Sequence, residues 1–341
     1  MAETAMKGRV SSQVVQKGDV GHIYGGVEIE GKITTAEALT LAGADFEVIK
    51  VPACLRDHDR TPLPDQWATA RTDVKGVEKI LTKKTVGKDY HIIQNARAFG
   101  WVDELLGSCN ECVITSAGTL FGGRYVWLCV DLGGYDVLPG DEMRHHLLIV
   151  NSHDGSSNMT FQLLDQRIVC QNVISVTGGA RGSGDPLKIR HTRLAEIRME
   201  DVQQALKLAG GQFKEAEEAM KLMGQTRLPV EEQDLLIYRG LGVSNKQLKL
   251  WQAGKLDKQP QWVNQAKVIS EAIVKGPGAD FGRGTVWGVL NGFTYYFDHE
   301  RHVRNSEDCP DIAVEQKILR GKGVRSKKLA FETCLKYCSR N

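Results

Sequence analysis

A short cationic segment is the part of this sequence whose residue types could bind a polyanion. The segment contains a single acidic residue, Asp185. Its cationic residues are Arg181, Lys188, Arg190, His191 and Arg193. Four glycines between residues 178 and 184 would let the segment adapt to a ligand. Because arginine and lysine neutralise phosphates, and such binding weakens steeply with salt, the segment predicts contacts to a nucleic-acid backbone.

Aromatic residues on an expected strand could supply the second part of such a site. The alternation over residues 124–132 places Tyr125 and Trp127 on one face of a strand, and Arg124 begins it. Bases of a single strand stack on exposed aromatic rings, so Arg124, Tyr125 and Trp127 join the candidate DNA-binding residues. Two simpler interpretations stay open. The two rings would pack inside the sheet, and the cationic segment would be a solvated surface.

Histidine and aspartate pairs raise the alternative of a metal-dependent enzyme. The sequence holds two such groups, Asp57-His58-Asp59 and His153-Asp154, and further ligand types at His145, His146, Asp298, His299 and His302. The first group lies in a proline-flanked segment. The second is followed by Gly155, as in a tight turn whose aspartate binds its own backbone. We therefore expect no metal site, and a turn at His153-Asp154.

The eight cysteines are expected to be reduced thiols, because the first residues lack the cationic and apolar regions of a signal peptide. Cys109 and Cys112 have the spacing of a zinc knuckle, whereas Cys334 and Cys338 do not. Because a structural zinc site usually needs two such knuckles, structural thiols are favoured over a zinc site. The sequence also lacks a Walker loop, a Gly-x-Ser-x-Gly motif and an apolar run of about 20 residues. These absences disfavour ATP-driven chemistry, serine nucleophiles and a membrane span.

Composition and periodicity predict an α+β protein. The 341 residues are 41% hydrophobic and 25% charged, with a net charge of only +2, so affinity for nucleic acid must come from local patches. The expected elements are a capped helix after Thr34, a strand at 46–51, a surface loop at 52–67, a strand-like stretch at 71–86, a helix from Tyr90 to 106, strands at 113–120, 124–132, 146–150 and 159–164, a strand or helix start at 167–176, helices at 199–220, 262–274 and 286–297, and a basic tail.

This order indicates a hairpin-rich antiparallel β-sheet core of β-β-β-α type, packed with helices and followed by a helical C-terminal half. The expected domains are an N-terminal α/β segment at 1–110, the sheet core with its cationic loop at 111–193, and a helical region with the basic tail at 194–341. That tail is either a second phosphate contact or a helix docked on the body.

Eight motifs in order resemble the phage/plasmid-like protein family, a domain of unknown function numbered 932. They are AGADFEV at 42–48, RTD at 71–73, YHIIQN at 90–95, GTLFGGRYVW at 118–127, NSHDGS at 151–156, RIVCQN at 167–172, RHT at 190–192 and WGVLNGFT at 287–294. The resemblance implies an origin on phages, prophages or plasmids. The chain departs from the family at Val173, where a threonine is usual, so a hydroxyl there is not essential.

The core pattern is also similar to phage annealing recombinases of the Red beta and RecT type. We therefore expect a single-stranded DNA binding and annealing protein of phage or plasmid recombination, acting in the bacterial host cytosol without ATP, metal or another cofactor. Its expected partners are single-stranded DNA and its own copies in a ring or filament, with a phage exonuclease or a single-strand binding protein as further candidates. A metal-dependent phosphohydrolase or nuclease, and a non-enzymatic host-interaction protein, remain the alternatives.

Overall fold

The computed structural model describes residues 26–55, 60–175, 186–194, 211–256 and 258–340. The chain forms two compact units. The first comprises Met1–Gly133, His146–Gln162 and Pro186–Leu208, and the second Gly134–His145, Leu163–Asp185 and Ala209–Asn341. The domain boundaries expected near residues 110 and 193 stay predictions, because compact units and separately folding domains are different properties. No helix in the described ranges is both long and apolar enough to cross a membrane.

The strands confirm the predicted antiparallel sheet. Among the described residues, seven strands form one sheet in the order β1-β4-β5-β6-β7-β8, and β9 also pairs with β7. Their bounds are Val27–Glu28 for β1, Val113–Leu120 for β4, Tyr125–Asp136 for β5, Glu142–Ser152 for β6, Met159–Arg167 for β7, Val173–Ser175 for β8 and Leu187–Ile189 for β9. The segment 167–176, left open as strand or helix, therefore ends β7, turns and forms β8.

The hairpin between β4 and β5 forms where its glycines predicted it. The turn η2 (Phe121–Gly123) places Gly122 at φ 70° and Gly123 at φ 98°, a region that glycine adopts without strain. A Cβ atom on Gly123 would lie 2.8 Å from the Phe46 ring, so the turn also needs glycine for close packing. The register then pairs Leu120 with Tyr125.

The positions of the short helices in the first unit are set by local capping and by one tertiary contact. Helix α2 (Thr35–Leu41) begins with the predicted capping box, in which Thr34 and Glu37 satisfy each other's backbone. The single helix expected from Tyr90 to residue 106 is wrong, because the chain forms α3 (Asn95–Phe99) and α4 (Val102–Ser108). Before α3, the Gln94 amide exchanges hydrogen bonds of 3.0 and 2.7 Å with the backbone of Val48, which holds this stretch extended.

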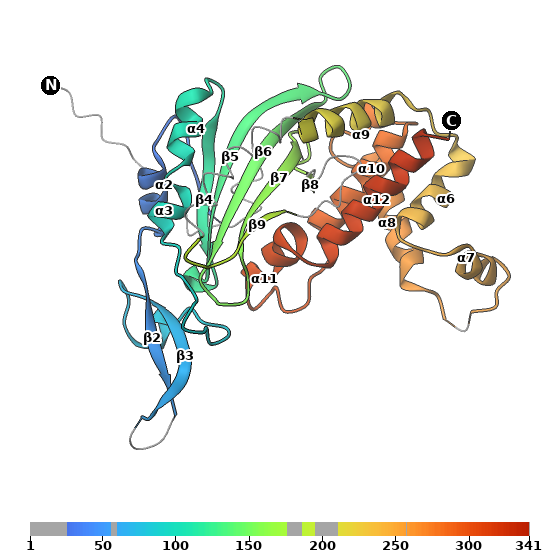
Figure 1. The fold of residues 1–341 in the computed structure, drawn as a ribbon. Helices are drawn as coiled ribbons and strands as arrows, with labels where there is room; N and C mark the ends of the chain where they lie inside the picture. The colour runs from blue at the N-terminus through green and yellow to red at the C-terminus, as the bar shows by residue number, and fades with distance from the viewer. Residues whose placement is uncertain (1–25, 56–59, 176–185, 195–210, 257, 341) are drawn as a thin grey trace. The chain divides into compact units, whose positions relative to one another are not determined.

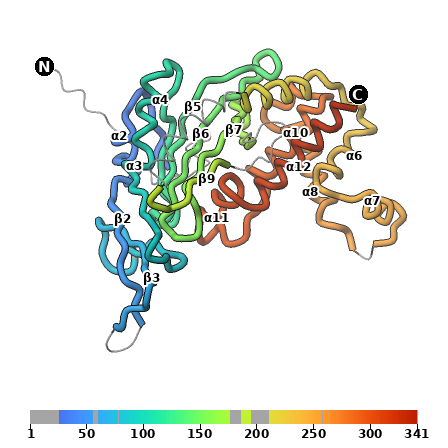
Figure 2. Tube along the Cα trace, in the orientation of Figure 1, coloured from blue at the N-terminus to red at the C-terminus, as the bar shows by residue number. Residues whose placement is uncertain are grey.

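The loop expected at 52–67 is also wrong. Strands β2 (Val48–Cys54) and β3 (Pro62–Arg71) form a two-stranded antiparallel sheet in which Pro52 lies opposite Trp67. Figure 2 shows the two strands running side by side. Pro52 lies on β2, whose only strand partner among the described residues is β3, so the other edge of β2 can hold a proline without losing a ladder hydrogen bond. Residues 71–86 contain the 3-10 turn η1 (Gly76–Lys79) and isolated bridges instead of the expected strand.

Cys109 and Cys112 form a disulfide at the junction of α4 and β4. The expectation of reduced thiols is therefore wrong for this pair. Their Cα atoms are 5.4 Å apart, within the range that a disulfide can bridge. Cys334 and Cys338 are free thiols inside a helix, and burial raises the pKa of both. Neither pair therefore presents the thiolates that a zinc knuckle needs.

The second unit contains the predicted helical C-terminal half (Figure 1). Residues 211–225 are helical, while residues 199–210 of the expected helix at 199–220 lie outside the described residues. The further helices are α6 (Val230–Gly240), α7 (Asn245–Gln252), α8 (Gln261–Lys275), α9 (Ala279–Gly282), α10 (Val286–Tyr295), η3 (Tyr296–Glu300), α11 (Pro310–Val314), η4 (Glu315–Leu319) and α12 (Lys322–Cys338). Helix α10 is central. All its residues except Tyr295 are buried, and it contacts both α8 and α12.

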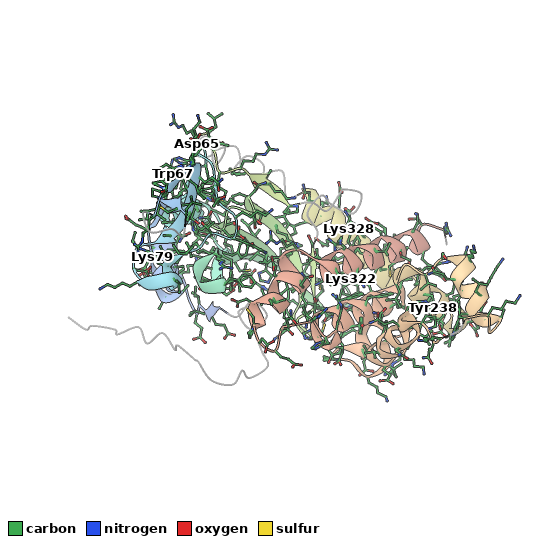
Figure 3. All side chains as sticks on the ribbon, turned by 90° about the horizontal axis from the view of Figure 1, so that it is seen from below. Asp65, Trp67, Lys79, Tyr238, Lys322 and Lys328 are labelled. Atoms are coloured by element: carbon green, nitrogen blue, oxygen red, sulfur yellow. A yellow bond between two sulfur atoms is a disulfide. The ribbon has the colours of Figure 1, made fainter. Side chains whose placement is uncertain are left out.

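The basic tail forms a helix that is docked on other helices, which is one of the two interpretations of the sequence. Helix α12 packs on α6 and α10, and it buries Phe331 and Cys334. Its Lys327 is also buried, and the ammonium binds the carboxylate of Asp298 and the carbonyl oxygen of Val173. Lys322 and Lys328 of the same helix, labelled in Figure 3, are more accessible to solvent than Lys327.

A buried ion pair links the loop before β6 to the end of β7 in this unit. The Arg167 guanidinium donates to both Asp141 oxygens at 2.6 and 2.8 Å, and their side chains are 2% and 0% exposed. Asp141 also accepts from the Trp287 indole at 2.7 Å, and Arg167 donates to the carbonyl oxygen of Gly278 at 2.8 Å. Motif residues far apart in sequence therefore meet around one carboxylate.

Changing Asp141 to alanine should leave Arg167 buried and unpaired. We expect Asp141→Ala to lower the free energy of unfolding by about 3–5 kcal/mol in urea denaturation followed by circular dichroism. Asp280→Ala is the matched control, because it breaks an Arg283–Asp280 pair whose side chains are 64% and 93% exposed. That control should change stability by less than about 1 kcal/mol. Equal losses of unfolding free energy in the two variants would contradict a stabilising role for the buried Arg167–Asp141 pair.

Candidate nucleic-acid interface

The turn after β6 is built around a buried carboxylate. Asp154 accepts hydrogen bonds from the Tyr125 hydroxyl at 2.7 Å and the Ser152 hydroxyl at 2.9 Å. Ser156 donates to it from its backbone at 2.8 Å and from its hydroxyl at 2.6 Å. Burial alone would raise the pKa of Asp154, but the bonds from Ser156, Tyr125 and Ser152 outweigh burial and lower it. Asp154 therefore shapes a turn, as the sequence predicted.

This turn holds a lysine-containing segment against the sheet. The backbone amides of Lys83 and Lys84 donate to the carbonyl oxygen of Asp154 at 2.9 and 3.2 Å. Gly155 adopts φ 72°, and a Cβ atom there would lie 2.6 Å from the Val86 side chain and 2.7 Å from the Lys84 carbonyl oxygen. A side chain at position 155 would therefore displace the segment that carries both lysines.

Lys50 fixes the other end of the lysine segment and lies beside a tryptophan. Its ammonium donates to the carbonyl oxygens of Gly87, Lys88 and Tyr90 at 3.2, 2.8 and 3.2 Å. The same ammonium lies 5.4 Å from the centre of the Trp67 ring. Trp67 is on β3, where Figure 3 labels it, and its side chain is half-buried. Its backbone pairs with Val86, between Lys84 and Lys88.

His191 joins the cationic segment to the lysine segment. The His91 amide donates to the His191 carbonyl oxygen at 3.0 Å, and the Tyr90 and His191 rings stack with centres 4.9 Å apart. The Tyr90 hydroxyl in turn donates to the Ser152 carbonyl oxygen at 3.4 Å. Two segments separated by about a hundred residues therefore lie against each other at the end of β6.

The predicted contact residues fall into three groups. Lys188, Arg190 and Arg193 are exposed, and Arg124 is half-buried beside the turn, where its carbonyl oxygen accepts from the His153 amide at 2.7 Å. Three others are buried, and Arg181 lies outside the described residues. The buried ones are Tyr125, Trp127 and His191, with exposures of 4%, 0% and 6%.

Burial changes what these three residues can do. The rings of Tyr125 and Trp127 are almost completely buried, so they offer no face to a base. Burial lowers the pKa of His191 to about 4, which makes it a neutral packing residue near neutral pH. The sequence missed Lys83, Lys84, Lys88 and Trp67. The local signal for the lysines was a Lys-Lys pair followed by Gly-Lys. The sequence had no signal for Trp67, because only the pairing of β3 with residue 86 places it next to these lysines.

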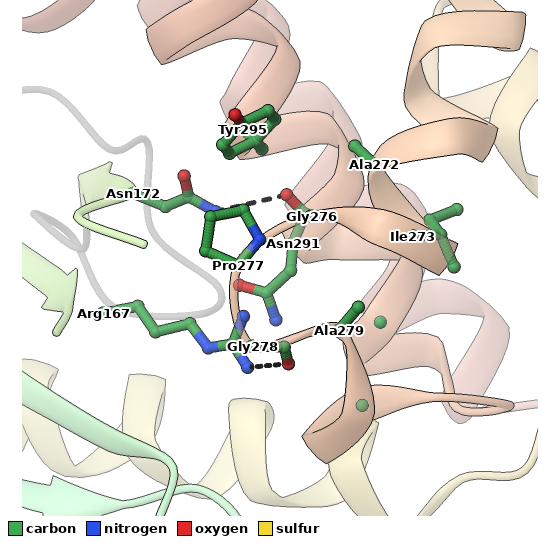
Figure 4. Close-up of a pocket in the computed structure, with 12 residues that line it drawn as sticks. Arg167, Asn172, Ala272, Ile273, Gly276, Pro277, Gly278, Ala279, Asn291 and Tyr295 are labelled. Carbon is green, nitrogen blue, oxygen red and sulfur yellow. Dashed lines mark hydrogen bonds between the residues drawn. The ribbon is translucent and has the colours of Figure 1, made fainter. Parts of the chain in front are cut away.

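The motifs at 167–172 and 287–294 contribute to the lining of a small cavity in the second unit. Arg167, Asn172 and Asn291 come from these motifs, and Tyr295 follows the second one. The Asn172 amide donates to the Asn291 carbonyl oxygen at 3.2 Å (Figure 4). Its volume of about 10 Å³ is room for roughly one water molecule, too little for a substrate. These residues therefore read as packing and hydrogen-bonding elements of the helical unit.

The described residues do not assemble the metal site that the hydrolase alternative requires. No group of three or more histidine, cysteine, aspartate or glutamate side chains lies within reach of one ion in these ranges. His153 is fully buried, and its Nε2 lies 2.8 Å from the Asn95 side-chain oxygen. Asp57-His58-Asp59 lies outside the described residues.

Acidification should destabilise the protein through two buried histidines. Burial, followed by the proximity of His191, lowers the pKa of His153 to about 3, and burial lowers that of His191 to about 4. Below about pH 6.5 the unfolded chain binds protons on both residues, while the folded chain does not. Each histidine should therefore remove up to about 1.4 kcal/mol of stability per pH unit until its folded pKa is reached.

Urea denaturation at pH 7, 6 and 5 measures this dependence. His191→Phe keeps a ring against Tyr90 and removes the titrating nitrogens, so it should make stability less sensitive to pH. His302→Gln is the control for removing a histidine at the surface, because the His302 side chain is 68% exposed. If His191→Phe has the same pH dependence as the unchanged protein, the neutral state of His191 is refuted.

Comparison with known proteins gives one family. A model described as Domain of unknown function (DUF932) matches residues 83–319, while no curated protein and no solved structure gives a match. The matched segment begins at the lysine segment and includes the Asp154 turn, His191, Arg167 and Trp287. Because it covers well over half of the chain, this protein belongs to the family of domain of unknown function 932.

Proposed function

We propose that this protein binds single-stranded DNA through a cationic surface. We use that name for the exposed side chains of Lys83, Lys84, Lys88, Lys188, Arg190 and Arg193. The hydrogen bond from His91 to His191 carries the proposal, because it joins the two segments that bear these six cations. None of the six forms an ion pair with a carboxylate of the described residues, so all are available to phosphates.

Base stacking on Trp67 would complete the interaction. Trp67 is half-buried, and it pairs through its backbone with Val86, in the middle of the lysine segment. Stacking of one base on an aromatic ring contributes about 1–3 kcal/mol and tolerates any sequence. Trp67 thus takes the role that the sequence suggested for Tyr125 and Trp127.

Annealing of complementary strands is the activity that we propose for this mode of binding. Contacts to phosphates carry no sequence information, and they leave the pairing edges of the bases free. Several copies in a ring or filament would add weak contacts along one strand, without ATP or metal. The similarity of the core pattern to annealing recombinases supports this proposal, and a phage exonuclease or single-strand binding protein stays a candidate partner.

Removing three cations should weaken binding in a salt-dependent way. The variant Lys188→Ala/Arg190→Ala/Arg193→Ala should bind a fluorescent oligo-dT more weakly. The slope of log affinity against log salt should fall by roughly 2, because each lost phosphate contact contributes about 0.7 for single strands. Fluorescence anisotropy across a salt series measures both quantities.

The matched control removes the same charge from the second unit. Lys214, Arg283 and Arg304 are exposed there, and changing all three to alanine should leave the salt slope unchanged. Equal slopes for the two triple variants would contradict the cationic surface. If the unchanged protein does not bind oligo-dT even at low salt, the proposed function fails.

Trp67 should contribute affinity that does not depend on salt. Trp67→Ala should weaken oligo-dT binding about five-fold or more without changing the salt slope, because stacking releases no counterions. Trp67→Phe keeps an aromatic face and should retain most of the affinity. Unfolding curves of both variants separate this effect from loss of the Lys50 contact. Unchanged affinity in a folded Trp67→Ala protein would remove stacking from the proposal.

A further inference from the structure

Three aromatic rings form a cluster among the helices of the second unit. Tyr238 comes from α6, Trp251 from α7 and Trp262 from α8, and all three are half-buried. Their ring centres are 6.0 Å apart for Tyr238–Trp251, 5.1 Å for Tyr238–Trp262 and 5.4 Å for Trp251–Trp262. The interplanar angles of 64°, 77° and 73° make every pair edge-to-face. Figure 3 labels Tyr238 among these helices.

An open groove lies beside this cluster, between α6, the end of α7 and α8. Tyr238 and Trp251 line it, and its volume is about 680 Å³, within the range typical of small-molecule sites. Its lining also holds Lys258 and Lys267, which can bind a phosphate. Asp234, Gln259 and Ser270 offer hydrogen bonds to a heterocycle or sugar.

The groove is lined by aromatic, cationic and acidic side chains, and this combination limits which class of ligand it can bind. A purely cationic ligand would find partners in the aromatic rings and in the carboxylates of Asp234 and Glu271, but it would also face Lys258 and Lys267. An apolar helix would bury these lysines and the carboxylates of Asp234 and Glu271 without partners, which is costly. A nucleotide has a flat ring system for the aromatic residues and an anionic group for the two lysines. The donor groups of its base and sugar can pair with the carboxylates of Asp234 and Glu271.

We propose that this groove binds a nucleotide, with the base against Trp251 and Tyr238 and the phosphate at Lys258 and Lys267. The site deepens the proposed function, because the nucleotide can belong to a bound single strand, but it does not require the cationic surface. Tyr238 stays neutral near physiological pH, since burial and the nearby Asp234 raise its pKa, so its hydroxyl can both donate and accept.

The walls of the groove are defined by local structure. Helix α7 begins with a capping box between Ser244 and Gln247, and Pro260 precedes α8 at its N-cap. Helix α7 has no fully buried residue, so its place depends strongly on Trp251. For this reason a loss of Trp251 alone is not a sufficient test, and a variant that changes only the phosphate end is also needed.

Fluorine NMR of the full-length protein tests the site with 5-fluorodeoxyuridine and its 5′-monophosphate as probes. We expect the monophosphate to bind, and Lys258→Ala/Lys267→Ala to weaken it at least about five-fold while leaving the nucleoside unchanged. Trp251→Ala should weaken both probes by a similar factor, and Trp251→Phe should retain binding of both. Absence of binding in the unchanged protein, or equal binding in all variants, would overturn the proposal.

Two further arms separate this site from the cationic surface. The variant Lys188→Ala/Arg190→Ala/Arg193→Ala should bind the monophosphate normally, and loss of that binding would move the site and overturn the proposal. Binding of the monophosphate without any binding of oligo-dT would refute the proposed function and support the groove as a site for free nucleotides. If tetramethylammonium displaces the monophosphate, the groove is a cation site and the proposal fails.

Discussion

A buried carboxylate that must be satisfied by hydrogen bonds organises the first unit. Asp154 lies at the end of β6, away from solvent, and four donor groups from Tyr125, Ser152 and Ser156 surround it. An ionised carboxylate without these donors would be strongly destabilising there. The turn that meets this requirement also places its carbonyl oxygen against the amides of Lys83 and Lys84. Placement of the lysine segment therefore depends on satisfying one charge.

The second unit meets the same constraint twice. Asp141 is satisfied by Arg167 and Trp287, and Asp298 by Lys327 and the backbone amide of Val173. In each case the carboxylate gathers donors from segments far apart in the chain, so it fixes their relative positions within the unit. The motifs of this unit are thereby explained as structural partners, and the groove between α6, α7 and α8 lies outside them.

Local patterns predicted much of the fold but only part of the site. The capping box at Thr34, the hairpin at Gly122-Gly123 and the alternation in β5 depend on neighbouring residues, and all three form as expected. The helix expected from Tyr90 failed because Gln94 binds Val48, 46 residues earlier in the chain. The prolines at 52–64 suggested a loop because a sequence does not show which strand edges are free. Lys188, Arg190 and Arg193 are exposed as expected, whereas Trp67 was not foreseen.

The sequence by itself determined the family, the antiparallel sheet with its helical half, and the presence of a locally cationic segment in a nearly neutral chain. Only the tertiary structure decided which aromatic rings reach solvent, since Trp127 is fully buried while Trp67 is half-buried beside the lysine segment. It also decided that His191 is neutral and that two cationic segments share one end of β6. The reason is physical: desolvation and long-range contacts set exposure and charge, and neither is encoded in the spacing of adjacent residues.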